Sequence, residues 1–173
     1  MDNSKIESII KAYGILKSNN SDTWLEDCSN AKSIKGAIEL AATAKNLNDK
    51  KHPHQYRIPN SVLDEFAMLI LRKGREINKV KTFDDLINII QACKIKGVSE
   101  LTIYDTAQRI GVYLKVYPTK IYLHRGTRVG AEKLLGKISG RTITKNDLPS
   151  AFQNSNLTPS QIEDLLCIYK GRL

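Results

Sequence analysis

The sequence predicts an all-α protein, built as a compact domain of about seven helices. Apolar residues recur at the three- and four-residue spacing of helices through most of the 173 residues. The N-terminal third contains no strong strand pattern, in which apolar and polar residues would alternate. The hydrophobic fraction of 41% and the chain length together suffice for a buried core without covalent cross-links. We therefore expect a single helical domain over residues 1–173.

Three amphipathic helices are predicted before residue 48. The first covers residues 4–17, the second lies at residues 22–28, and the third contains the apolar positions between residues 34 and 42. Ser61 and Thr82 are predicted to cap the next two helices, because hydroxyl side chains accept hydrogen bonds from the backbone N–H groups at helix starts. If the domain has lobes, we expect them to be residues 1–47 with 61–93, and residues 94–173.

Residues 48–60, NDKKHPHQYRIPN, are predicted to form a loop because they combine two prolines with clustered charge. His52 and His54 could place two imidazoles near one point. No cysteine accompanies them, and no acidic residue stands at a convincing ligand spacing. We therefore expect an exposed loop, no metal site and no cofactor.

After residue 93, the sequence predicts shorter elements separated by turns. Ser99 is predicted to cap a helix over residues 100–114, residues 120–123 to form a short extended piece, and Gly126 to open a further helix. Residues 137–157 are rich in loop-forming residues. The run Thr158-Pro159-Ser160-Gln161 predicts the start of the last helix, because it combines a Thr cap, a Pro in the first helical position and a Gln three residues after the cap.

Cysteine usage and hydropathy indicate a cytoplasmic protein. Cys28, Cys93 and Cys167 are odd in number and far apart in sequence, so we expect reduced packing residues and no disulfide framework. The first residues lack the apolar core of a signal peptide, and no window approaches the ~20 apolar residues that span a bilayer. We therefore expect no membrane partner.

The net charge of +9 is concentrated in one stretch of the chain. Residues 94–145 contain 11 Lys/Arg and 3 Asp/Glu, a net charge of +8. A positive field of this kind attracts polyanions such as nucleic acid. An acidic protein partner is an alternative, and so is a solvated basic surface that serves solubility.

Three segments follow one another here: a helix over residues 83–93, the turn Gly97-Val98-Ser99, and a second helix with Thr102 near its start. The arrangement resembles the helix-hairpin-helix motif of the DNA glycosylase superfamily, with vaguer similarity to about residue 136. The resemblance implies a helix-hairpin-helix-like C-terminal half, in which the turn and the positive end of the second helix hold a DNA phosphate. The alternative is a plain turn between helices at Gly97, with Thr102 and Asp105 serving the start of the second helix.

The resemblance does not extend to the catalytic residues of that superfamily. Leu101 or its neighbours occupy the place of the nucleophilic lysine, and Thr119 and Lys120 lie near the place of the catalytic aspartate. Asp105 lies inside the second helix and is not a substitute. The resemblance therefore implies a phosphate grip without base excision. The segments YDTAQRIG and LHRGTRVGA also resemble uncharacterised bacterial proteins, which implies no function.

The most concentrated polar cluster is His124-Arg125-Gly126-Thr127-Arg128. A histidine can act as a general base, arginines can hold phosphates, and a Gly-Thr turn can open an anion-binding helix. Glu132 is the only acidic residue nearby, so the cluster lacks the carboxylates that Mg²⁺ requires.

We expect a non-enzymatic protein that binds nucleic acid, with DNA held through its phosphates. One alternative is an interaction module for an acidic protein, and another is a hydrolase or nucleotide-processing enzyme that uses His124. The candidate nucleic-acid-binding residues are Lys96, Gly97, Ser99, Thr102, Arg109, Lys120, Arg125, Thr127, Arg128 and Lys133.

Overall fold

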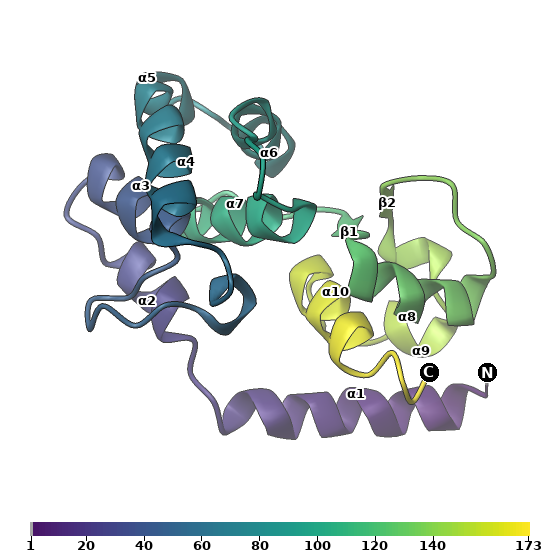
Figure 1. Ribbon diagram of the computed structural model, residues 1–173. Coiled ribbons are helices and arrows are strands. Elements are labelled where there is room, and N and C mark those ends of the chain that lie inside the picture. Colours follow the sequence, from purple (N-terminus) through teal and green to yellow (C-terminus); the bar gives the residue numbers. More distant parts are fainter. Residues whose placement is uncertain (1) are drawn as a thin grey trace. The chain divides into compact units, whose positions relative to one another are not determined.

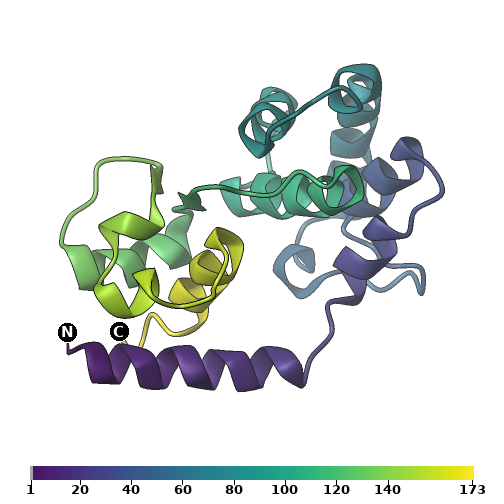
Figure 2. The same cartoon turned by 180° about the vertical axis from the view of Figure 1, so that it is seen from behind.

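The computed structural model describes residues 2–173, and helices account for most of them (Figure 1, and Figure 2 from behind). The described residues contain ten α-helices, two short 3-10 helices and one two-stranded antiparallel sheet. The all-α fold class is thus confirmed, with more helices than the seven expected because α2, α5 and α9 span only four to seven residues. None of the helices in residues 2–173 has the length and apolar character required to span a lipid bilayer.

The chain divides into two compact units. The central unit is Asp22–Tyr117, and the terminal unit combines Met1–Ser21 with Pro118–Leu173. These units differ from the lobes expected from the sequence, which joined residues 1–47 to 61–93 and separated them from 94–173. The difference arises because the helix over residues 100–114 packs against helices that lie before residue 93. The N-terminal helix, over residues 3–18, instead packs against the C-terminal part of the chain.

The central unit is built around helix α7 (Glu100–Leu114), which packs against α2 (Thr23–Ser29), α3 (Ile34–Thr43) and α6 (Phe83–Ala92). Helix α4 (Asn60–Arg72) packs on α3, and the short α5 (Gly74–Ile77) follows it (Figure 1). A 3-10 helix, η1 (Pro53–Gln55), interrupts the predicted loop and contacts α7. The apolar stripes of these helices are buried, including Ile38, Ala41, Phe66, Ile70, Leu86, Ile90, Ile103, Ala107 and Ile110.

Local capping signals locate most helix starts correctly in both units. The side chain of Thr82 accepts from Asp85 N, that of Ser99 from Thr102 N, and that of Thr158 from Gln161 N. The prediction for Ser61 is wrong, because the cap position is Pro59, two residues earlier, and α4 begins at Asn60. The Pro59 carbonyl accepts from the N–H groups of the first turn, and the fixed backbone angle of proline supplies the helix entry in place of a side-chain cap.

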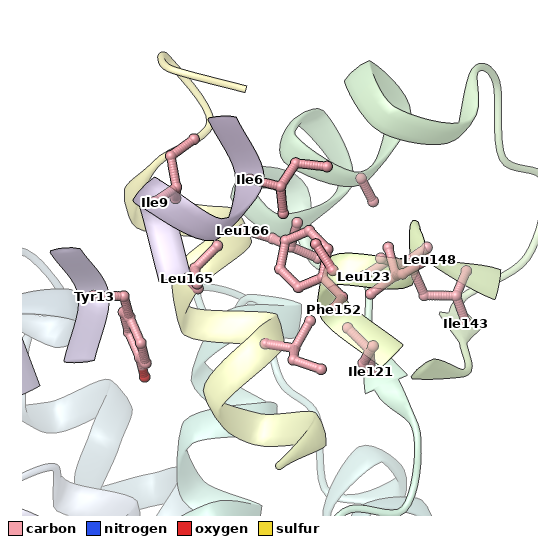
Figure 3. Close-up of a cluster of buried hydrophobic side chains, with 13 residues drawn as sticks. Ile6, Ile9, Tyr13, Ile121, Leu123, Ile143, Leu148, Phe152, Leu165 and Leu166 are labelled. Atoms are coloured by element: carbon pink, nitrogen blue, oxygen red, sulfur yellow. The ribbon is translucent and has the colours of Figure 1, made fainter. Parts of the chain in front are cut away.

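The terminal unit contains α1 (Asn3–Ser18), α8 (Arg125–Leu135), α9 (Ser150–Gln153) and α10 (Pro159–Ile168). The expected extended piece is present as β1 (Ile121–Tyr122), which pairs with β2 (Thr142–Ile143), and a 3-10 helix, η2 (Lys145–Asp147), follows. Helix α10 packs against α8 and β1. Figure 3 shows the core between them, where Phe152 of α9 lies among Leu123, Leu165 and Leu166.

Helix α1 belongs to this core although it lies at the other end of the sequence. Its Ile6, Ile9 and Tyr13 are buried in the same cluster (Figure 3). The Tyr13 hydroxyl donates to Asp164 Oδ2 at 3.0 Å, and Asn3 Nδ2 donates to Ser150 Oγ at 2.8 Å. The N- and C-terminal segments of the chain therefore share one core.

Candidate functional site

A buried polar cluster lies where the loop around η1 meets α7. Asp105 comes from the second turn of α7, and its side chain is 10% exposed. Its Oδ2 accepts from Gln55 Nε2 at 2.8 Å and lies 2.9 Å from His54 Nδ1. An ionised carboxylate only accepts hydrogen bonds, so Nδ1 of His54 carries the hydrogen in this contact. The pair fixes the tautomer of His54 and ties the loop to α7.

Arg109, one turn further along α7, completes the buried side of this cluster. Its guanidinium donates to Gln55 Oε1 at 3.1 Å and to the Ala41 carbonyl of α3 at 3.3 Å, and it lies 3.9 Å from Asp105 Oδ2. Gln55 therefore bridges the cation and the anion, with its amide nitrogen on Asp105 and its oxygen on Arg109. Such a buried charge pair is stable only when hydrogen bonds offset its loss of solvation, and Gln55 and the Ala41 carbonyl supply such bonds here.

His52 and Trp24 form the outer side of the cluster. The ring of His52 lies edge-to-face against His54, with 4.7 Å between centroids, and against Trp24 at 4.8 Å. His52 Nδ1 accepts from the backbone N–H of His54 at 3.2 Å, so its ring hydrogen is on Nε2 in this arrangement. The Trp24 indole donates to the Lys50 carbonyl at 3.0 Å. These contacts hold both histidine side chains at the outer side of the cluster.

Burial and charge determine the protonation of these groups. Burial raises the pKa of Asp105, but the His54 hydrogen bond and the charge of Arg109 outweigh it, so that the pKa lies below the ordinary value. Burial, with a smaller contribution from Arg109, lowers the pKa of His52 to about 4. At neutral pH Asp105 is therefore ionised and His52 is uncharged.

A second buried polar cluster lies in the terminal unit between α8 and α10. His124 Nε2 pairs with Glu163 Oε1 of α10, and the Thr127 hydroxyl donates to the same carboxylate oxygen. The hydroxyl also lies 2.8 Å from His124 Nε2. The side chains of His124 and Glu163 are 7% and 6% exposed, so this arrangement encloses the histidine that the sequence offers as a general base.

Four of the predicted nucleic-acid-binding residues surround the turn between α6 and α7. Gly97 has a φ of 94° and is exposed, as are Lys96 and Ser99. A side chain at Gly97 would be strained by this backbone angle, and its Cβ would lie 3.2 Å from Val62 Cγ1. Thr102 is buried and has its N–H capped by Ser99, so it serves the helix start.

The other predicted residues are divided between surface and interior positions. Arg109 and Thr127 are buried in the two polar clusters. Arg128 donates to the Ile138 and Gly140 carbonyls at 2.7 Å each, and Lys133 donates to the Lys170 carbonyl at 2.6 Å. Arg125 is exposed, and Lys120 is half-buried. Several cations that the sequence assigned to a ligand thus bind the protein's own carbonyl groups.

Exposed basic residues of the terminal unit lie at both ends of α8 and in the segment after it. Residues 118–145 contain seven Lys/Arg and one Asp/Glu. Arg128 and Glu132 hold the segment 138–140 against α8, and the backbone of Arg141 accepts from Leu123 N at 2.8 Å. These contacts place exposed Lys137 and Arg141 beside α8, whose first residue is exposed Arg125. We call Arg125, Lys137 and Arg141 the basic patch.

Sequence reasoning missed the partners in both clusters. Asp105 was expected inside the second helix, with service to the helix start as one alternative, and Gln55 and Glu163 were not singled out at all. His54 and Asp105 are 51 residues apart, and Thr127 and Glu163 are 36 apart, so no local spacing connects them. Their one signal is polarity on an otherwise apolar helix stripe, since a buried polar group needs a partner.

Comparisons with models of protein families, with curated proteins and with solved structures give no match to this chain.

Proposed function

We propose that this protein binds nucleic acid, with duplex DNA as the first candidate, through phosphate contacts at the basic patch of the terminal unit. The observation that supports the proposal is the excess of seven Lys/Arg over one Asp/Glu in residues 118–145, three of which form the patch. Cations that neutralise phosphates release condensed counterions, which supplies affinity without base recognition.

The three residues of the patch are distributed along α8. Arg125 begins α8 and Lys137 follows its end, so a helix of 11 residues, about 16 Å long, separates them. Arg141 returns beside the start of the helix through its backbone contact with Leu123. Arginine holds phosphate through two parallel hydrogen bonds, which suits Arg125 and Arg141 to this role.

We propose the turn between α6 and α7 as a separate phosphate contact of the central unit. Gly97 brings the backbone close to the surface, exposed Lys94 and Lys96 flank it, and the first N–H groups of α7 have no carbonyl partner within their helix. Glu100 opposes an anion here, so we expect this turn to contribute less than the basic patch.

The test is fluorescence anisotropy with a labelled duplex across a salt series. We expect affinity to fall steeply with salt, and the double variant Arg125→Ala with Arg141→Ala to reduce the slope of log K against log salt by about 2, because each lost phosphate contact removes about 0.9. Arg128 is left unchanged because it holds the 138–140 segment. The control is Lys5→Ala with Lys11→Ala, two exposed lysines of α1 in the same unit.

The contribution of the turn is measured with Lys94→Ala and Lys96→Ala together. Lys79 and Lys81 provide the matched control, because they are also exposed, two residues apart, and precede α6 as Lys94 and Lys96 follow it. Equal effects of the two pairs would remove the turn from the proposal. Absence of binding by the wild type at low salt, where charges are least screened, would overturn the nucleic-acid function and favour an acidic protein partner.

A further inference from the structure

We propose that His52, His54 and Asp105 form a binding site for one divalent transition-metal ion of the Zn²⁺ type. One ligand atom from each of the three side chains lies within 4.8 Å of the others. This proposal is independent of nucleic-acid binding, because the site lies in the polar cluster of the central unit and uses no residue of the basic patch.

The donor set matches the chemistry of a borderline cation. Imidazole nitrogen and carboxylate oxygen are common ligands of Zn²⁺ and related ions, and three protein ligands leave at least one position for water or substrate. A site that faced only the interior could not exchange such a ligand. The side chain of His54 is 46% exposed, whereas that of Asp105 is 10% exposed, so the site has one open side and one anchored side.

The three ligand atoms need to move only slightly closer together to bind one ion. With metal–ligand bonds of about 2.1 Å, the ligand atoms of a tetrahedral site lie roughly 3.4 Å apart. His52 and His54 stand on either side of Pro53 at the start of the short η1, and we expect rotation of their side chains to bring the ligand atoms closer by the remaining ångström or so. An ion bound at His54 Nδ1 would replace the hydrogen that this nitrogen shares with Asp105. The hydrogen bonds of Asp105 to His54 and Gln55 both use Oδ2, so Oδ1 takes neither of them.

The surrounding residues already form the outer shell that metal ligands require. Gln55 donates to the Asp105 carboxylate and orients it, and Trp24 packs against His52. Arg109 lies 3.9 Å from Asp105, and its positive charge opposes a cation. We therefore expect micromolar affinity, weaker than that of a closed structural zinc site, and an ion that exchanges readily.

The test is calorimetric titration of the full chain, without an affinity tag, with Zn²⁺ alone. We expect one ion per chain, and we expect His54→Gln and His52→Gln each to weaken binding by about tenfold or more. His54→Gln is the primary variant because the His54 side chain is 46% exposed, and far-UV circular dichroism verifies the fold. Asp49→Asn is the matched control, because Asp49 is an exposed carboxylate of the same loop with a φ of 58° that asparagine adopts well.

Proton NMR of the imidazole rings locates the ion. The chain has three histidines, so Zn²⁺ should shift the ring signals of His52 and His54 and leave those of His124 in place. A response at His124 alone would move the ion to the Glu163 cluster and overturn the proposal. Absence of saturable Zn²⁺ binding by the wild type, or wild-type affinity in the variant that lacks both His52 and His54, would overturn it as well.

Discussion

At the scale of single residues, the buried charges of the central unit depend on one another. Arg109 and Asp105 are both buried, so each charge has lost most of the solvation that it would have in bulk water. Their cost of burial is offset by the contacts to Gln55, His54 and the Ala41 carbonyl. Removing one charge from such a network leaves the other without compensation, which is more costly than replacing the whole set.

We therefore expect Arg109→Met to lower the free energy of unfolding of the central unit by roughly 3–5 kcal/mol. Methionine retains most of the apolar stem but leaves Asp105 and the Gln55 oxygen without the guanidinium. Urea unfolding followed by circular dichroism measures the change. Arg75→Met, at an exposed position of α5, is the control and should alter stability by less than about 0.5 kcal/mol. Equal effects of the two substitutions would show that the network contributes little.

At the scale of elements, the packing of α8 on α10 depends on two glycines of α8, where a side chain would collide with α10. A Cβ at Gly130 would lie 2.2 Å from the Leu166 carbonyl oxygen, and a Cβ at Gly126 would lie 2.5 Å from Cys167 Sγ. The two helices thus approach closely along this line, which also brings Glu163 within reach of Thr127 and His124. The second polar cluster therefore depends on the same close packing.

We expect Gly130→Ala to destabilise the terminal unit by about 1–3 kcal/mol or more, because backbone atoms of α10 must move to admit the methyl group. Thermal unfolding of the purified variant measures the effect. Gly14→Ala is the opposing control in the same unit, since nothing lies within 4 Å of a Cβ there. It should raise stability by about 0.5–1 kcal/mol, because alanine favours the helical backbone. A stable Gly130→Ala variant would contradict the close approach of these helices.

At the scale of the whole molecule, the chain leaves one unit and returns to it. Helix α1 lies in the core of the terminal unit, and the central unit occupies the sequence between α1 and the remaining elements of that core. The central unit is continuous in sequence and has its own apolar interior. Loss of the N-terminal segment should therefore affect the two units unequally.

We expect deletion of residues 2–21 to unfold or loosen residues 118–173 while residues 22–117 keep their protection from hydrogen exchange. The deletion removes Ile6, Ile9 and Tyr13 from the core around Phe152 (Figure 3), and the exposed apolar surface weakens that unit. Hydrogen exchange resolved by peptide measures both units in one sample. Uniform loss of protection in both units would refute their independence.

Much of the secondary structure could be predicted because its causes are local. The apolar spacing of Ile6, Ile9 and Tyr13 predicted α1, and the hydroxyl caps at Thr82, Ser99 and Thr158 predicted three helix starts. The exception at Ser61 is also local, since two kinds of helix entry compete within adjacent residues and Pro59 prevails. The short α5 and α9 carry too few residues for a periodic pattern to identify them.

By itself, the sequence determined the all-α class, the position of the longer helices and the excess of positive charge after residue 93, because composition and short-range backbone hydrogen bonding are sufficient for these properties. The tertiary structure alone decided that Asp105 contacts His54 with His52 close by, and that Glu163 contacts His124. It also decided that Arg109 and Arg128 bind the protein while Arg125 and Arg141 are exposed. These contacts join residues far apart in the chain. They depend on how apolar faces pack together, and packing is a property of the assembled helices.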